Sequence, residues 1–179
     1  QLMKRAMKGK LGLLQAAKAL QDELLNPSMS FDEDTSLLSA ETKLAQNAKK
    51  VALMVLGTAA QKYMMALSEQ QEVLMNCADI IMDAYQMETA ILRAKKYADK
   101  NGEEAAGRYI DMASVYCNDA IQRVEAKAKN TIAAISEGDE GRTLLVALKR
   151  FTKNNSPVNT IAARQRIADV MIAANTYTY

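Results

Sequence analysis

The two prolines of this 179-residue chain, Pro27 and Pro157, leave the long stretch between them free of proline. Proline interrupts a helix because it lacks the backbone N–H and its ring clashes with the preceding turn. Glycine, the other common interrupter, occurs only seven times. Alanine, leucine and methionine dominate the apolar residues, and they lose little on entering a helix. These features predict an all-α fold of long helices rather than many short strands.

Apolar residues recur at three- and four-residue steps, which is the period of a helix with one buried face. The pattern predicts helical segments at about 1–25, 39–67, 69–100, 103–136, 140–152 and 157–174. Short turns join most of these segments. We therefore expect one domain, residues 1–179, folded as an up-down antiparallel bundle of five to six helices.

Three short motifs predict where helices begin or end. Ser68 followed by Gln71 matches a capping box, so a helix should begin there. Gly102 should occupy a left-handed position just after the next helix end. Ser156 and Pro157 match an N-cap followed by proline at the first helical position, and predict the start of the last helix.

The inner faces of the later helices follow from the same periodicity. We expect a narrow seam of mostly small side chains on the fourth helix, where helix backbones could approach closely. The methionines lie in largely apolar stretches and are interpreted as core residues; an adaptable groove for a partner is the alternative. The residues assigned inward are Leu74, Cys77, Ile81, Ala84, Met87 and Ile91, then Ile110, Ala113, Cys117, Ala120, Val124 and Ala128, then Ile161, Ala162, Ile167, Ala168, Met171 and Ile172, with Met64, Met65, Met75 and Met82 as further core methionines.

Candidates for chemistry are scarce. Cys77 and Cys117 lie in apolar helical patterns and are interpreted as buried reduced thiols, with a disulfide or reactive thiol as the alternative. The chain has no histidine, which excludes the usual di-iron and histidine zinc sites of helical bundles. The acidic pairs at 103–104 and 139–140 are expected to stabilise helix N-termini. The segment 138–142 lacks the ending of a phosphate-binding loop. We therefore predict no catalytic, cofactor-binding or metal-binding residue.

The composition also bears on partners and location. A net charge of +2 with 5% aromatic residues does not indicate nucleic-acid binding. No apolar run is long enough to predict a transmembrane helix, and no signal peptide is recognisable. Cytoplasmic location is therefore expected. Gln1 begins inside a helical pattern without a capping residue, which suggests a piece of a longer protein.

The first helix carries bases and no acids over its first twenty residues. Lys4, Arg5, Lys8 and Lys10 are the candidate contact residues. They form either a solvated face, an interface with the rest of a longer protein, or a surface that lies on an anionic membrane.

Three long strings carry a family resemblance: KLAQNAKKVALMVLGTAAQKY at 43–63, EQQEVLMNCADIIMDAYQMETAILRAKK at 69–96 and SPVNTIAARQRIADVMIAAN at 156–175. Together they resemble the extra C-terminal region of large bacterial acyl-CoA dehydrogenases, which is similar to the tail of the very-long-chain enzyme. The resemblance runs from Leu2 to Asn175, and none of its strings is a catalytic motif.

The resemblance implies a non-catalytic domain of a flavoprotein that acts in fatty acid β-oxidation. In that family an upstream core binds FAD, removes the α-proton of an acyl-CoA with a glutamate and passes hydride to the flavin. No glutamate of this chain lies in the matching motif. The implied partners are that core and further copies in a homo-oligomer. A free-standing helical adaptor that binds a partner helix is the alternative; an independent enzyme is disfavoured by the absence of histidine and of an acid/base pair.

Overall fold

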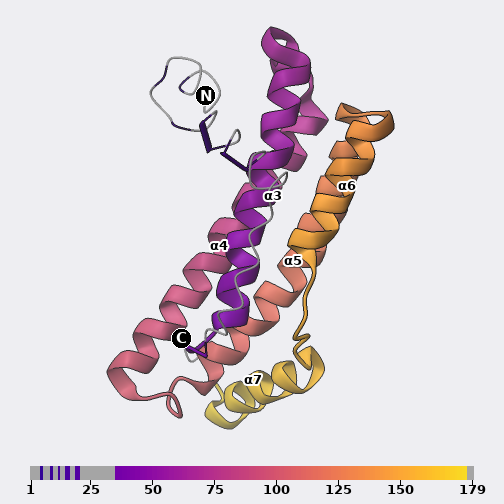
Figure 1. Ribbon diagram of the computed structural model, residues 1–179. Coiled ribbons are helices and arrows are strands. Elements are labelled where there is room, and N and C mark those ends of the chain that lie inside the picture. Colours follow the sequence, from indigo (N-terminus) through magenta and orange to yellow (C-terminus); the bar gives the residue numbers. More distant parts are fainter. Residues whose placement is uncertain are drawn as a thin grey trace.

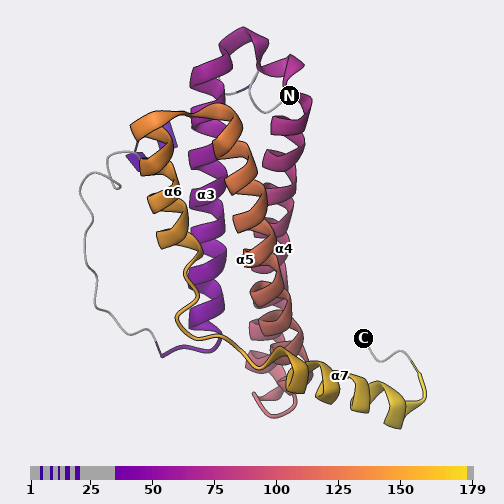
Figure 2. The same cartoon turned by 90° about the vertical axis from the view of Figure 1, so that its right-hand side faces the viewer.

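The computed structural model describes residues 35–176 and, before them, the separate positions 5, 9, 12, 15, 16, 19 and 20. Within these residues the fold is all α-helical, as expected. Four helices lie side by side, and the last one runs outward from the foot of the bundle (Figures 1 and 2). The elements are α3 (Ser39–Tyr63), the 3-10 helix η1 (Met64–Glu69), α4 (Gln71–Asn101), α5 (Gly107–Ile135), α6 (Gly138–Thr152) and α7 (Thr160–Ala174). The helix expected at 1–25 lies outside the continuously described residues.

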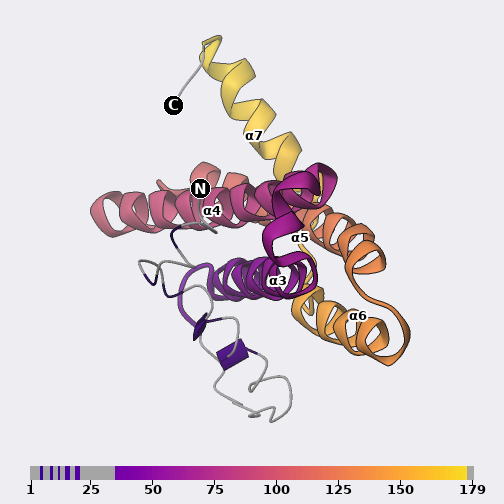
Figure 3. The ribbon, with the colours of Figure 1, turned by 90° about the horizontal axis from the view of Figure 1, so that it is seen from above.

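Helix α5 is the centre of the arrangement, because it contacts α3, α4, α6 and α7. The view from above shows α5 between α4 and α6, with α3 beside them (Figure 3). Its predicted seam of small side chains is confirmed: Ala113, Cys117, Ala120, Val124 and Ala128 are buried. Ile110 is only partly buried. Small side chains on a central helix let several neighbours pack closely against it.

The buried face of α4 differs from the predicted one by a small rotation. Cys77, Ala84, Met87 and Ile91 are buried as expected. Leu74 and Ile81 are only partly buried, while their neighbours Val73 and Ile80 lie in the core. Apolar residues adjoin each other on both edges of this stripe, so periodicity alone did not determine its centre.

The junction between α3 and α4 differs from the sequence prediction. Helix α3 ends at Tyr63, and the 3-10 helix then continues to Glu69, with Met64 at a positive φ of 47°. Ser68 is therefore not an N-cap, and Gln70 precedes α4 without any side-chain cap. Leu67 is buried in this turn, and its burial favours the 3-10 path over the predicted capping box. Gly102 ends α4 with a positive φ of 88°, as expected.

The starts of α5 and α7 also differ from prediction. Helix α5 begins at Gly107, so Glu103 and Glu104 lie in the preceding turn. The predicted cap at Ser156 and Pro157 is wrong. Asn159 caps α7 instead, because its side-chain oxygen accepts a hydrogen bond from the Ala162 N–H at 3.1 Å. Asparagine is among the best N-cap residues.

The predicted inner face of α7 is wrong as well. Ala163 is the residue of α7 that is buried, whereas Ile161, Ala168 and Ile172 are exposed. The helix contacts α5 rather than inserting among the others, and Figure 2 shows it extending away from the bundle. An apolar residue on such a helix has few neighbours to cover it.

Most of the methionines assigned to the core are exposed. Met87 is fully buried, as predicted, but Met75 is 64% exposed and Met65 is 79% exposed. Met64 and Met82 are exposed too. The core interpretation was wrong for these four residues, because a helix with apolar residues on two faces can bury only the face that its neighbours cover.

Among the described residues, one stretch is long and apolar enough to cross a membrane by length and composition, Ser39–Glu69, whose most apolar 18-residue window has a mean hydropathy of 1.2. The bundle buries 56% of its most apolar window. The helix α3 within it contributes Val51, Val55 and Ala59 to the core at 0% exposure. The hydropathy of this stretch is therefore explained by packing within the bundle.

Candidate functional site: charged contacts and exposed helix faces

The deepest polar contact joins α3 to α5. Glu41 is buried, and Ser114 donates a hydrogen bond to its carboxylate at 2.6 Å. Nearby on α3, Thr42 accepts a hydrogen bond from Lys95 of α4 at 3.2 Å. A buried carboxylate needs such partners because burial removes its water. These contacts tie three helices together.

A second polar cluster joins α4 to α5. Arg123 contacts the largely buried Asp83 at 2.6 Å, and Tyr116 donates to the same carboxylate at 3.1 Å and also contacts Gln86. The hydrogen bond to Asp83 raises the pKa of Arg123. The pKa of Tyr116 is raised chiefly by burial and, to a smaller extent, by its contact with the Asp83 carboxylate. Arg123 and Tyr116 therefore keep their protons at neutral pH, and the cluster holds α4 and α5 together.

The cysteines are buried free thiols, as predicted. Burial raises the pKa of Cys77 to about 11, and burial together with the Glu41 carboxylate raises the pKa of Cys117 to about 12. The thiolate is the reactive form of cysteine. Neither residue is thus a nucleophile at neutral pH.

Both thiols should react with a thiol reagent near pH 8 more than about 100-fold more slowly in the folded chain than in denaturant. In the folded chain both thiols stay protonated at pH values above 9.0, the ordinary pKa at which they ionise in the unfolded chain. The free energy of unfolding should therefore fall as the pH rises from about 9 toward about 12. Timed labelling with mass detection checks the first point. Rapid labelling of either cysteine in the folded chain would contradict it.

Two ion pairs attach α7 to α5. Arg164 contacts Asp119 at 2.5 Å. Arg166 donates to the two carboxylate oxygens of Asp111, from Nη2 at 2.5 Å and from Nε at 2.8 Å. Asp111 raises the pKa of Arg166, chiefly through this hydrogen bonding. Ala163 of α7 is buried, and Ala162, Ile167 and Met171 are partly buried. The ion pairs add to this small apolar contact, and salt screens exposed charges.

Replacing both acids, Asp111→Asn with Asp119→Asn, should release α7 while the bundle stays folded. We expect amide hydrogen exchange in α7 to rise about 3- to 10-fold, with little change in α3 to α6. Added salt should act in the same direction on the unaltered chain. Asp139→Asn, which removes the pair with Arg142 inside α6, is the matched control. Equal exchange of α7 in both variants would disprove this role.

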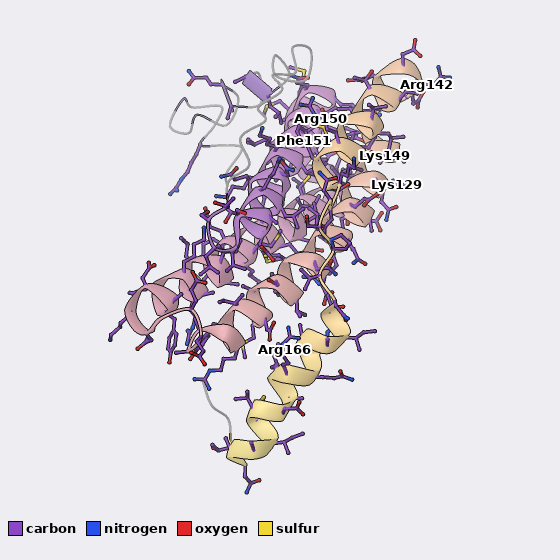
Figure 4. All side chains as sticks on the ribbon, turned by 60° about the horizontal axis from the view of Figure 1, so that its bottom comes forward. Lys129, Arg142, Lys149, Arg150, Phe151 and Arg166 are labelled. Carbon is purple, nitrogen blue, oxygen red and sulfur yellow. The ribbon has the colours of Figure 1, made fainter. Side chains whose placement is uncertain are left out.

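The bases of α5 and α6 do not converge on one point. Figure 4 labels Lys129, Arg142, Lys149 and Arg150, which lie on these two helices, and Arg166 on α7. Arg142 is already paired with Asp139 at 2.9 Å. The buried Phe151 lies 5.7 Å from the ammonium of Lys50, so the base facing this ring comes from α3. Arg142 and Lys50 thus each have a partner within the described residues.

Of the four predicted contact residues, Arg5 is described as an exposed helical residue. Lys4, Lys8 and Lys10 lie outside the described residues. Their predicted role in contact with a membrane or an interface therefore stays a prediction.

The part of the chain that the structure describes contains no group of three metal-ligating side chains. Its two best-formed hollows, of about 570 and 640 Å³, are open grooves near the α3–η1 end of the bundle. Glu137 and Glu140 line one, and Glu69 and Glu72 line the other. Carboxylates repel the phosphate groups of a dinucleotide. We therefore assign no flavin contact to these residues.

The most distinctive surface is the outer face of α4, which sequence reasoning assigned to the core or left unassigned. Met75, Met82, Tyr85 and Leu92 are all more than half exposed there. Exposed apolar groups that form a continuous patch are typical of interaction surfaces. The heptad spacing of these residues was the signal in the sequence that could have identified the surface.

Comparison with known proteins places the chain among dehydrogenase domains. A family model described as the C-terminal domain of acyl-CoA dehydrogenase matches residues 47–150. A probable acyl-CoA dehydrogenase of Bacillus subtilis is 36% identical over 176 residues, which is 98% of this chain but 29% of that protein.

A crystal structure supports the same placement. The acyl-CoA dehydrogenase from Bacillus anthracis, solved in complex with FAD, matches the fold with a TM-score of 0.94 at 39% identity. The match covers 99% of this chain and 30% of that one. The predicted family resemblance is thereby confirmed: the chain belongs to the family of acyl-CoA dehydrogenase C-terminal domains.

Proposed function

We propose that the chain is the non-catalytic helical domain of an FAD-dependent acyl-CoA dehydrogenase. A catalytic core elsewhere in the protein would bind FAD and carry out α,β-dehydrogenation of acyl-CoA in fatty acid β-oxidation. The helical domain packs on that core or on further subunits of a homo-oligomer in the cytoplasm. The observation that carries the proposal is the extent of the matches. Nearly the whole chain matches each relative, yet it corresponds to less than a third of that relative's length.

The contacts of the described residues support a structural role. The polar side chains of the interior bind one another across helices, as Glu41 does with Ser114 and Asp83 with Arg123. The two thiols are protonated at neutral pH. What remains available for function is surface, especially the exposed apolar side chains of α4 and α7.

Purification of the complete natural protein and of the 179-residue chain tests the proposal. The complete protein should show flavin absorbance and reduce an electron acceptor with an acyl-CoA. The 179-residue chain should be helical, colourless and inactive. Activity in that chain would overturn the proposal in favour of an independent enzyme. A complete protein without flavin would overturn it in favour of the free-standing adaptor.

Contact with an anionic membrane through the first helix is a second proposal. It depends on the cluster of Lys4, Arg5, Lys8 and Lys10, and Arg5 is exposed. Replacing all four with Glu should abolish co-sedimentation with anionic vesicles, since each base near such a surface contributes about 1 kcal/mol. Binding that does not change, or no binding by the unaltered chain, would refute this proposal.

A further inference from the structure

Helix α4 carries two apolar stripes on opposite faces. The buried stripe includes Cys77, Ala84, Met87 and Ile91 and packs against α3 and α5. The second stripe points away from these helices. We call it the outer seam, and it consists of Met75, Ala78, Met82, Tyr85, Thr89 and Leu92, all exposed. A helix with apolar residues on both faces is normally covered on both.

The outer seam has the spacing of a coiled coil. Its members follow one another at alternating three- and four-residue steps, as the a and d positions of a heptad do. The steps continue without a break from Met75 to Leu92, about 26 Å along the helix axis. Tyr85 and Leu92 are 68% and 60% exposed. This geometry suits another helix packed lengthwise. Along α4, neither of the two best-formed hollows reaches beyond Asn76.

The seam is also symmetric about its own centre, the midpoint between Asp83 and Ala84. Met75 and Leu92 are equidistant from that point, as are Met82 and Tyr85. In an antiparallel pair of identical helices, each a position faces a d position of the other chain. Two copies of α4 related by a twofold axis would therefore bring large apolar residues together at both ends and in the middle, with Ala78 facing Thr89.

The charges along α4 also favour an antiparallel pair. Glu69 and Glu72 lie at its start, whereas Arg93, Lys96 and Lys100 lie toward its end. In the antiparallel pair the acidic start of each copy faces the basic end of the other, and a parallel pair would bring like charges together. Neither Glu72 nor Lys96 has an ion pair within the described residues. Complementary charge steers association and selects orientation.

We propose that the outer seam of α4 is a self-association surface, on which two copies of this domain pair their α4 helices antiparallel about a twofold axis. The inference rests on one part of the proposed function, namely that the domain belongs to a larger oligomeric enzyme. The face is self-complementary, as a twofold interface requires. It gives the homo-oligomer a contact separate from any contact that its catalytic core makes.

Cysteine cross-linking in the complete protein, with its flavin bound, tests the register. Met75→Cys and Leu92→Cys are prepared separately and then mixed under mild oxidation. The mixture should form a disulfide dimer between the two variants, whereas either variant alone should form at least about tenfold less, because its cysteines lie far apart across the axis. The two cysteines of this chain are buried, and the unaltered complete protein, oxidised in parallel, serves as the background.

A charge exchange provides the control for orientation. Glu72→Lys should weaken self-association of the complete protein about tenfold or more, and the exchange Glu72→Lys with Lys96→Glu should restore it. Both positions are exposed, so the fold should tolerate either change. Flavin content and dehydrogenase activity are measured on the same samples.

The outcomes separate the two proposals. Disulfide formation by Met75→Cys alone, or no mixed disulfide in an active flavoprotein, would overturn the antiparallel pairing and leave the proposed function intact. In the latter case the catalytic core is the alternative occupant of the seam. Absence of flavin and activity in the unaltered protein would instead contradict the proposed function.

Discussion

Met87→Ala should lower the free energy of unfolding by about 2–5 kcal/mol, the usual range for truncating a fully buried methionine. Met87 has 0% exposure and belongs to the core cluster formed by α3, α4, α5 and α6. Truncation removes apolar contacts and leaves a cavity that close-packed helices fill only in part. Urea unfolding followed by circular dichroism measures the loss, and the slope with denaturant should stay unchanged.

Met65→Ala is the matched control, because it removes the same atoms from a side chain that is 79% exposed. Its effect should be within about 0.5 kcal/mol. The pair therefore measures burial rather than the residue type. Equal destabilisation by the two substitutions would show that the methionines of α4 and η1 are not divided between core and surface as described.

Ala120→Leu should lower the free energy of unfolding by about 1–3 kcal/mol, because it overpacks the core instead of leaving a cavity. Ala120 has 0% exposure on α5, the helix that contacts α3, α4, α6 and α7. A larger side chain has no space there, so a neighbouring helix must move away. Hydrogen exchange should therefore increase along the displaced helix as well as near the substitution.

Ala126→Leu on the same helix is the control, since Ala126 is exposed and helix propensity hardly differs between the two residues. It should change the free energy of unfolding by less than about 0.5 kcal/mol. If Ala120→Leu were equally harmless, the seam of small side chains would not be setting the distance between the helices.

The sequence was sufficient for the fold class because local features carried it. Few prolines and glycines, helix-forming residues and the three- and four-residue period all act over one or two turns. The small seam of α5 and the burial of both cysteines were predicted on the same basis and are confirmed. The Ser156–Pro157 motif matches two local rules for a helix start, yet Asn159 caps α7.

The sequence predictions were wrong where residues far apart in the sequence determine the end or the position of a helix. The end of α3 at Tyr63 depends on a turn in which Leu67 is buried. The position of α7 depends on Asp111 and Asp119, which lie 55 and 45 residues from their arginine partners. No local pattern reveals such contacts, because each partner alone resembles an ordinary solvated charge.

The sequence by itself determined that this protein is a set of long amphipathic helices, and the comparisons agree on its family. Only the tertiary structure decided which apolar residues face inward. Met75 and Met87 stand in the same helix, and each belongs to a regular apolar stripe. One stripe is buried because α3 and α5 cover it, and the other is exposed because no described helix lies against it. Periodicity defines a stripe, but only a neighbouring element can bury it.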